Sequence, residues 1–505
     1  MTDPAPEAPD TIAPTAGLGR RTARGAMVTL GGQAVRMTIQ IGGVVVLAHL
    51  LSPHDYGLLA MVLTVVGVGD LFRDFGLSSA AIQATTLSRH QRDNLFWLNT
   101  GIGAVLALAT FLAAPLIADL YDEPDLVGIA RALSLTFLLN GLATQYRASL
   151  TRHMQFAKLA LIDIAGPAVA LAVAVLMAVN GAGYEALVVQ QLTTAAVLLA
   201  GVVVVGRWLP GLPRRHVPMR GLLKFGWNLL GTQLVGYASN NVDSLTIGVR
   251  FGTVSLGLYN RAFSLLMQPL TQLRAPTTTV ALPVLSRLRD DTVRFGEFVR
   301  RGQLALAYTL VAGLSLVIAA AEPLTQILLG PQWTGVIPLI RFLAAAGMFQ
   351  TLAYVGYWVY LATGLTGVLL RYTLVSAAIR ITCVVVGSTW GVVGVAAGYA
   401  VAPMLAWPLS LWWLSRHTPV PLRALLTGAL RTLAAFGACA AVGWYASTLV
   451  DGRWPALLVA LGASLAFFGL VWLAVPLIRR DVREVVDVVH LARSGGGPRK
   501  VPAAA

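Results

Sequence analysis

Charged side chains are scarce in this chain of 505 residues. Only 12% of the residues are Asp, Glu, Lys or Arg, about half of the roughly 25% that is usual in soluble globular domains. Hydrophobic residues make up 56%, and the mean hydropathy is +0.72. A soluble globule has too small an interior to bury that much apolar surface, so this composition excludes a water-soluble enzyme.

Common catalytic and metal-binding patterns are also missing. None of the three lysines, Lys158, Lys224 and Lys500, is followed by Ser or Thr, so the chain has no phosphate-binding loop of the G-x-x-x-x-G-K-[ST] type. H-E-x-x-H and G-x-S-x-G do not occur either. The two cysteines, Cys383 and Cys439, lie in apolar stretches and form no metal-ligand or disulfide pattern. We therefore predict a protein that is not an enzyme and that uses neither a cofactor nor a metal ion.

What the chain does contain is a series of long apolar runs. About 20 helical residues cross a hydrocarbon core of about 30 Å, and fourteen runs of that kind can be found. We predict an all-α polytopic membrane protein with about fourteen transmembrane helices. They lie near residues 26–51, 57–82, 95–118, 125–146, 158–179, 184–206, 221–249, 255–280, 301–320, 336–361, 366–387, 391–414, 424–449 and 455–478.

The distribution of the basic residues predicts how the chain is oriented in the membrane. With the N-terminus inside, 28 of the 37 Lys and Arg residues fall in the inner segments, whereas only Arg250 and Arg453 fall outside. Such a split follows the positive-inside rule and predicts that both termini are cytoplasmic. The basic residues are spread over short loops without interleaved aromatic residues, so we expect them to meet membrane lipids and not nucleic acid.

An internal repeat divides the chain. Gly31-Gly-Gln-Ala-Val35 aligns with Gly231-Thr-Gln-Leu-Val235, and Gly57-Leu58 aligns with Gly257-Leu258, all at an offset of 200 residues. The repeated spans differ by an even number, so the halves are expected to be parallel repeats around a central substrate path. We predict two six-helix lobes in parallel pseudo-repeat plus two C-terminal helices. The expected parts are a disordered cytoplasmic tail (1–25), an N-terminal lobe (26–206), a basic cytoplasmic linker (207–224), a C-terminal lobe (221–415), two extra helices (424–478) and a cytoplasmic tail (479–505).

Seven arginines remain inside the predicted spans. Each costs roughly 2.5–3.5 kcal/mol at the centre of a membrane helix, so those far from the span ends must face a cavity or a partner. Guanidinium groups in a cavity suit an anionic cargo, and their planar fork matches phosphate. The candidates for binding an anionic headgroup are Arg36, Arg73, Arg261 and Arg274.

Polar side chains accompany these arginines on single helical faces. Thr29, Gln33, Arg36 and Gln40 follow one another at spacings of four, three and four residues, which places them on one side of a helix. Two readings remain open, because such stripes line a cavity in some bundles and hydrogen-bond neighbouring helices in others. The predicted cavity-lining polar residues are Gln33, Gln40, Asp70, Asp74, Asn240, Asn241, Asp243, Asn260 and Gln268.

Asp70, Arg73 and Asp74 leave a similar choice. They fall at i, i+3 and i+4, so they form either an ion-paired triad within one helix or a contact to substrate.

Short motifs resemble one known family. Leu50-Leu-Ser-Pro-His-Asp-Tyr-Gly57 resembles the L-x-P-x-D-Y-G turn after the first helix of polysaccharide flippases. Leu256-Gly-Leu-Tyr-Asn260, Pro283-Val-Leu-Ser-Arg287 and Leu329-Gly-Pro-Gln-Trp333 are similar to that family's second half. The chain thus resembles, over roughly residues 20–415, the polysaccharide exporters of the multidrug/oligosaccharidyl-lipid/polysaccharide superfamily, often labelled lipopolysaccharide biosynthesis proteins.

The resemblance implies a function. Such proteins flip undecaprenyl-diphosphate-linked oligosaccharide across the bacterial cytoplasmic membrane by alternating access, for surface polysaccharide biosynthesis. The expected partners are the lipid-linked oligosaccharide, membrane lipids and possible glycan polymerases or glycosyltransferases of the same pathway. Two alternatives are a drug/cation antiporter of the same superfamily and a membrane-embedded glycan polymerase or ligase. The antiporters rely on acidic cavity residues, whereas span 26–51 carries Arg36 and no carboxylate.

Overall fold

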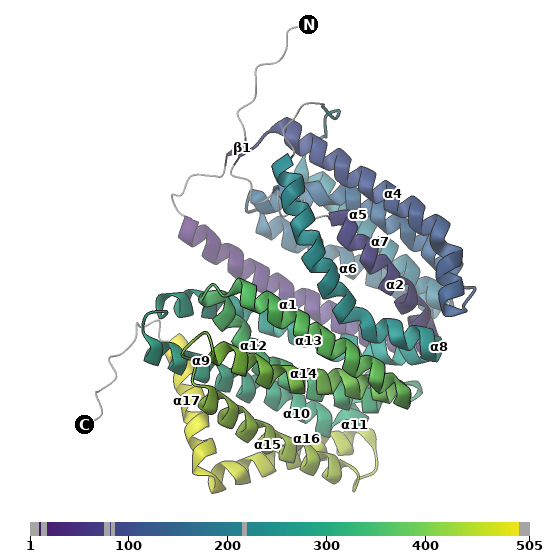
Figure 1. Cartoon of the computed structure of the whole chain (residues 1–505). Helices are drawn as coiled ribbons and strands as arrows, with labels where there is room; N and C mark the ends of the chain where they lie inside the picture. The colour runs from purple at the N-terminus through teal and green to yellow at the C-terminus, as the bar shows by residue number, and fades with distance from the viewer. Residues whose placement is uncertain (1–9, 12–17, 75–80, 82–85, 215–219, 494–505) are drawn as a thin grey trace. The chain divides into compact units, whose positions relative to one another are not determined.

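The computed structural model describes residues 10–11, 18–74, 81, 86–214 and 220–493, and side chains within residues 31–73, 81, 87–214 and 233–487 (Figure 1). The predicted tail 1–25 lies largely outside these ranges, although α1 already begins at Leu18. The side chain of Asp74 and part of the linker 207–224 also lie outside them. Apart from a two-residue pairing of β1 (Asp10–Thr11) with β2 (Thr86–Leu87), the described elements are helical.

The chain divides into two compact units, residues 1–261 (unit 1) and 262–505 (unit 2). The helices that begin in unit 1 are α1 (Leu18–Leu50), α2 (Pro53–Asp74), α4 (Arg89–Tyr121), α5 (Leu126–Arg152), α6 (Phe156–Val179), α7 (Tyr184–Gly206) and α8 (Arg220–Arg287). The last part of α8 belongs to unit 2.

Unit 2 continues with α9 (Thr292–Leu306), a π-helical turn η1 (Ala307–Val311), α10 (Ala312–Ala319), α11 (Ala321–Leu328) and the short turn η2 (Pro331–Trp333). It is completed by α12 (Val336–Ala362), α13 (Thr366–Gly387), η3 (Ser388–Trp390), α14 (Gly391–Ser415), α15 (Leu422–Ser447), α16 (Arg453–Ala474) and α17 (Pro476–Arg493).

These helices match the predicted membrane spans. Eleven stretches of the described chain are long and apolar enough to cross a membrane, and one of them, Thr366–Ser415, contains both α13 and α14. The two predicted spans that remain, 221–249 and 255–280, coincide with the two parts of α8. Within the described residues, each predicted span therefore has a helical counterpart, and the prediction of an all-α polytopic membrane protein is confirmed.

The long helix α8 is broken at Gly252, where φ is 73°. That region of φ favours glycine because a Cβ would clash with the backbone. The turn that results lies against the start of α2 so closely that a Cβ on Gly57 would be 1.9 Å from the carbonyl oxygen of Thr253. A Cβ on Gly257 would in turn be 1.8 Å from the carbonyl oxygen of Pro53. The two glycines aligned by the sequence repeat therefore permit one backbone-to-backbone contact.

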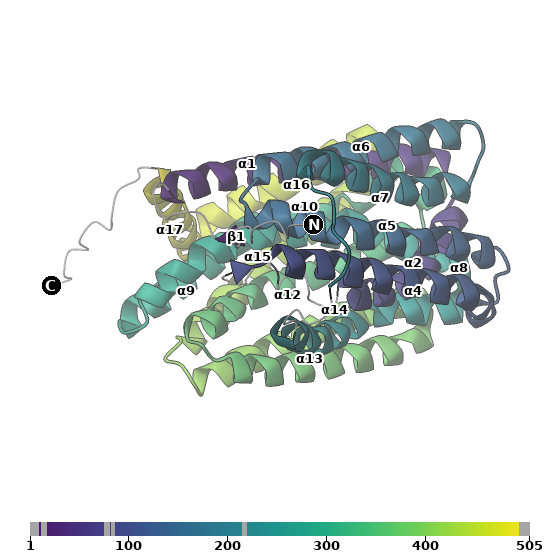
Figure 2. The same cartoon turned by 90° about the horizontal axis from the view of Figure 1, so that it is seen from above.

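Within unit 1, α5 is the central helix, and it contacts α2, α4, α6 and α7. α1 packs along α6, and α6 along α7, so that these helices run side by side (Figure 2). The apolar side chains of α5 that point to its neighbours are fully buried, Leu133 and Phe137 among them. This arrangement leaves the polar face of α5 directed at the space between α1, α2 and α6.

Within unit 2, the last two long helices join the bundle, because α15 packs on α10, and α16 packs on α11 and α15. α17 then turns away from α16 and contacts α9 (Figure 1). The carboxylate of Asp481, which is 2% exposed, accepts hydrogen bonds from Nε and Nη2 of Arg431 at 2.8 and 2.7 Å. Glu484 pairs with Arg300 at 2.7 Å. Ion pairs thus attach α17 to the helices before it.

Candidate functional site

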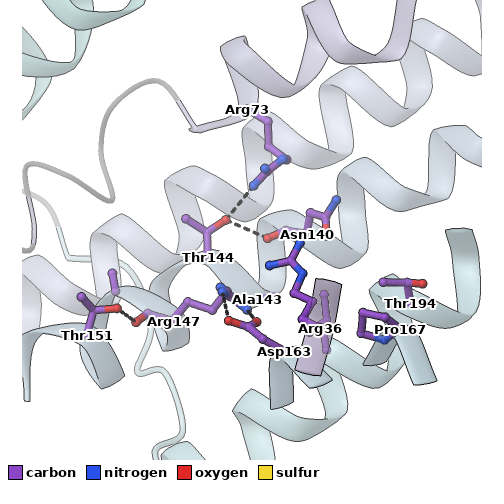
Figure 3. Close-up of a pocket in the computed structure, with 12 residues that line it drawn as sticks. Arg36, Arg73, Asn140, Ala143, Thr144, Arg147, Thr151, Asp163, Pro167 and Thr194 are labelled. Atoms are coloured by element: carbon purple, nitrogen blue, oxygen red, sulfur yellow. Dashed lines mark hydrogen bonds and ion pairs between the residues drawn. The ribbon is translucent and has the colours of Figure 1, made fainter. Parts of the chain in front are cut away.

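A pocket of about 400 Å³ opens between five helices of unit 1 (Figure 3). Such a volume lies within the range of small-molecule sites. The lining is largely polar or charged and comes from α1, α2, α5, α6 and α7. The lining residues are Arg36, Arg73, Asn140, Ala143, Thr144, Arg147, Ala148, Thr151, Asp163, Pro167, Thr194 and Leu198.

Helix α5 supplies half of this lining from one face. Asn140, Thr144, Arg147 and Thr151 recur at spacings of four, three and four residues, which aligns their side chains along one side of a helix. Both threonines also return a hydrogen bond to the carbonyl four residues earlier, at 2.7 and 2.9 Å. The hydroxyl groups are therefore held in place as part of the pocket wall.

Arg147 of α5 and Asp163 of α6 form an ion pair inside the pocket. Nη1 lies 2.7 Å from Oδ1, and Nη2 lies 3.2 Å from Oδ2, so both nitrogens of the guanidinium fork are engaged. Both side chains keep some exposure, 39% for Arg147 and 26% for Asp163. Pro167, one turn further along α6, cannot donate the usual helical hydrogen bond to the carbonyl of Asp163. This part of the pocket is consequently rich in hydrogen-bonding groups.

Arg73 enters the pocket from α2 and is satisfied by two groups. Its Nε donates to Oδ1 of Asp70 at 2.9 Å, and its Nη1 donates to the hydroxyl of Thr144 on α5 at 2.8 Å. The i, i+3 pairing of Asp70 with Arg73, one of the two readings left open above, is thus present. Arg73 nevertheless remains a lining residue of the pocket.

Arg36 differs from the other two arginines. It projects from α1 into the pocket (Figure 3), its side chain is exposed, and it has no hydrogen-bond or ion-pair partner among the residues that the structure describes. Three arginines and one aspartate line the pocket, and Asp70 pairs with Arg73 from outside the lining, which leaves the positive charge of Arg36 without a counter-ion among the described residues. An arginine without a counter-ion at membrane depth is costly, so the pocket is suited to an anion, and above all to phosphate.

Arg261 and Arg274, the other two arginines expected to bind the headgroup, lie elsewhere. Arg261 belongs to unit 1, is not among the lining residues, and stacks on the ring of Tyr56 at 3.8 Å. Arg274 belongs to unit 2, is 7% exposed, and contacts the ring of Tyr354 at 5.5 Å. The structure therefore brings Arg36 and Arg73 together and gives Arg261 and Arg274 aromatic neighbours.

The predicted polar residues of α8 make local contacts. Asp243, 1% exposed, accepts a hydrogen bond at 2.5 Å from the hydroxyl of Tyr259, which lies beyond the break at Gly252. Asn241 donates to the carbonyl of Tyr237 at 2.9 Å. Gln33 and Gln40 on α1, and Asn260 and Gln268 on α8, are half-buried, whereas Asn240 is exposed.

Sequence reasoning missed two charged members of the pocket. Arg147 was counted among the inner-loop arginines, although α5 continues to Arg152. Asp163 follows the start of α6 by only seven residues, a position from which charged side chains often reach the membrane surface. The four-three-four spacing of the polar residues on α5 was the signal that could have revealed this face. No cluster of three or more His, Cys, Asp or Glu residues that could hold a metal ion occurs in the part of the chain that the structure describes.

Comparisons with known proteins give a consistent picture. A sequence model of the family described as "Polysaccharide biosynthesis protein" matches residues 46–338, more than half of the chain. The chain is 24% identical over 383 residues to the lipopolysaccharide biosynthesis protein WzxC of Escherichia coli, covering 75% of this chain and 76% of that protein. It is 25% identical over 299 residues to the succinoglycan biosynthesis transport protein ExoT of Rhizobium meliloti, covering 59% of this chain and 60% of that protein.

Among solved structures, the fold is similar to that of the lipid II flippase MurJ in an inward closed conformation. The TM-score is 0.65 at 14% sequence identity, and the match covers 89% of this chain and 99% of MurJ. At that identity the similarity concerns the fold alone.

Proposed function

The chain belongs to the polysaccharide biosynthesis protein family, and from that premise we propose that it is a flippase for lipid-linked oligosaccharide. The cargo is an oligosaccharide joined through a diphosphate to undecaprenol. The protein moves this cargo across the cytoplasmic membrane by alternating access, for the synthesis of a surface polysaccharide. Relatives named for lipopolysaccharide and succinoglycan biosynthesis support this assignment.

The pocket of unit 1 is the observation that carries the proposal. It offers Arg36, Arg73 and Arg147 on helices that cross the membrane, with a single carboxylate among its lining residues. A diphosphate is the charged part of a lipid-linked oligosaccharide, and crossing the hydrocarbon core without counter-charges is prohibitive. The arginines replace its hydration while the undecaprenyl chain stays in the lipid.

The remaining predicted residues take secondary positions in this scheme. Arg261 and Arg274 are proposed to contact the headgroup during the transport cycle, and the polar residues of α1 and α8 are proposed to contact the sugars.

The two six-helix lobes are proposed to rock against each other and so expose the pocket to one side of the membrane at a time. Both termini are proposed to be cytoplasmic, and a glycan polymerase or glycosyltransferases of the pathway are the proposed partners.

The two alternatives fit the pocket less well. A cation antiporter needs carboxylates where its cargo binds, whereas the lining has three arginines against one aspartate. A polymerase or ligase would need catalytic groups in a large outer loop, and no loop outside the predicted spans exceeds about 25 residues.

Analysis of lipid-linked intermediates tests the proposal. In cells that lack the gene, complete oligosaccharide units on undecaprenyl diphosphate should accumulate in the inner leaflet, and the surface polysaccharide should be lost. Re-expression of the wild-type chain should reverse both effects. Single units displayed on the outer leaflet of the mutant would point to a missing polymerase and reject the flippase assignment.

A further inference from the structure

The ion pair between Arg147 and Asp163 places an anion of the protein itself inside a pocket suited to anions. The carboxylate engages both nitrogens of the guanidinium fork, at 2.7 and 3.2 Å. A phosphate group binds an arginine fork through the same two parallel hydrogen bonds. Asp163 and a phosphate therefore compete for the same two nitrogens of Arg147.

A carrier that returns without cargo needs such an internal anion. An arginine left unpaired at membrane depth is costly, and the pocket contains three arginines. Arg73 is satisfied by Asp70 and Thr144, and Arg147 is satisfied by Asp163. The protein's own groups thus neutralise or hydrogen-bond two of the three pocket arginines.

We propose that Asp163 is the counter-ion of Arg147 when no cargo is bound. A phosphate of the cargo then displaces the Asp163 carboxylate from the guanidinium group, and the carboxylate binds again when the cargo leaves. The proposal rests on the flippase function inferred above. Asp163 is in this sense a positioning residue, because it acts on the cargo only through Arg147. The α5–α6 ion pair opens on binding and closes on release.

This exchange selects for a diphosphate. Replacing the carboxylate at Arg147 by one phosphate substitutes one anion for another, so a monophosphate gains little there. The second phosphate of a diphosphate can bind Arg36 without displacing a carboxylate, since Arg36 has no hydrogen-bond or ion-pair partner among the described residues. The pocket of unit 1 is therefore expected to bind prenyl diphosphates in preference to prenyl monophosphates.

Binding measurements on the purified full-length protein test the exchange, with farnesyl diphosphate and farnesyl monophosphate as probes and farnesol as the uncharged control. Asp163→Asn removes the competing charge and nearly preserves the side-chain shape. It should tighten the binding of farnesyl monophosphate about tenfold, the worth of one charge-assisted hydrogen bond, and reduce the preference for the diphosphate. Surface polysaccharide in cells should fall at the same time, because release becomes slower.

Three further variants separate this role from a structural one. Asp163→Glu restores the carboxylate and should recover both the wild-type preference and export. Asp163→Ser is a second neutral variant. Its hydroxyl can accept a hydrogen bond from Arg147, just as the hydroxyl of Thr144 accepts one from Arg73 at 2.8 Å. Asp125→Asn removes a carboxylate from the turn before α5, outside the pocket, and should change neither affinity nor export.

The outcomes are distinguishable. Unchanged or weaker monophosphate binding in folded Asp163→Asn overturns the proposal, and so does failure of both neutral variants to fold, which would make the ion pair structural. If the wild type itself binds neither prenyl phosphate, the proposed anionic cargo fails and this inference fails with it. If the wild type prefers the diphosphate and Arg36→Ala weakens binding while Asp163→Asn has no effect, only the counter-ion role is rejected.

Discussion

Arg36 is a cation on a membrane helix without a partner among the described residues. Placing an arginine at the centre of a membrane helix costs roughly 2.5–3.5 kcal/mol on the insertion scale. Arg73, by contrast, is held by Asp70 and Thr144 at 2.9 and 2.8 Å. A residue that costs stability and makes no hydrogen bond or ion pair with a described residue is expected to serve the cargo.

Arg36→Ala should therefore lower surface polysaccharide at least about tenfold, since it removes a charge-assisted hydrogen bond to phosphate. Arg36→Lys keeps the charge but not the fork and should retain part of the export. Polysaccharide on intact cells, normalised to the amount of protein in the membrane, is the measurement. Arg131→Ala, which removes an arginine of α5 that stacks on Phe111 outside the pocket lining, serves as control and should export normally. Equal polysaccharide in the Arg36 and Arg131 variants would contradict the role of the pocket.

Part of this site was predictable from the sequence. Arg36 and Arg73 stood out because they lie at least nine residues from either end of their predicted spans, 26–51 and 57–82, where a charge needs a cavity or a partner. Arg147 and Asp163 lie nearer the ends of α5 and α6, where the same residue types commonly serve topology or reach the interface. Only the packing of α5 against α6 brings them face to face. The spacing of the polar residues on α5 indicates a polar face that includes Arg147, but neither hydropathy nor spacing shows that Asp163 lies opposite it.

The C-terminal helix α17 shows how ion pairs attach an element to the bundle. The segment 479–505 was expected to be a cytoplasmic tail, and the described part of it continues α17 to Arg493. Its attachment depends on Asp481, whose carboxylate is nearly inaccessible and holds Arg431 through two hydrogen bonds. Removing one partner of a buried pair is costly, because the other charge stays behind without compensation.

Asp481→Ala should accordingly destabilise the docking of α17 by about 3–5 kcal/mol. Limited proteolysis in detergent should then cleave the chain after α16 at protease concentrations that leave the wild type intact, and thermal unfolding should begin earlier. Arg480→Ala breaks the exposed pair with Glu484 and should cost no more than about 1 kcal/mol. A cleavage rate in Asp481→Ala no faster than in Arg480→Ala would show that α17 is held by its apolar contacts instead.

The contact between α2 and the break in α8 depends on the absence of side chains. A methyl group on Gly57 would overlap the carbonyl of Thr253, 1.9 Å away. Gly57→Ala should force the two backbones apart and cost about 1–3 kcal/mol or more, measured as a lower unfolding temperature of the purified protein. On α5, a Cβ at Gly128 would have no heavy atom within 4 Å. Gly128→Ala should therefore leave the free energy of unfolding unchanged or raise it by up to about 1 kcal/mol. Equal unfolding temperatures for the two variants would contradict the close approach.

At the scale of the whole molecule, apolar length and the placement of arginine were sufficient to predict the all-α polytopic fold. The family resemblance read from the Leu50–Gly57 turn is confirmed by the family match over residues 46–338. The break in α8 lies between the predicted spans 221–249 and 255–280, but Gly252 is one of 50 glycines and only the backbone shows its positive φ. The division into lobes, the linker and the two extra helices stays a prediction.

The orientation of the chain can be tested with single cysteines in a variant whose Cys383 and Cys439 are replaced by alanine. Asp125→Cys lies in the turn between α4 and α5, and His153→Cys in the turn between α5 and α6. A membrane-impermeant maleimide should label position 125 in intact cells and position 153 only after the membrane is opened, because the arginine distribution places the second turn inside. The reverse pattern would invert the whole topology.

One consequence follows from the fact that all twelve lining residues of the pocket belong to unit 1. Groups fixed within one compact unit keep their mutual geometry, so under the proposed function this pocket contributes nearly the same diphosphate affinity in every orientation of the carrier. A ligand that binds two conformations equally well does not change their populations, however tightly it binds. Binding of the headgroup in this pocket therefore holds the cargo but favours neither orientation of the carrier. Under the proposed function, net movement therefore needs a driving force outside this pocket, such as consumption of the flipped glycan on the far side of the membrane.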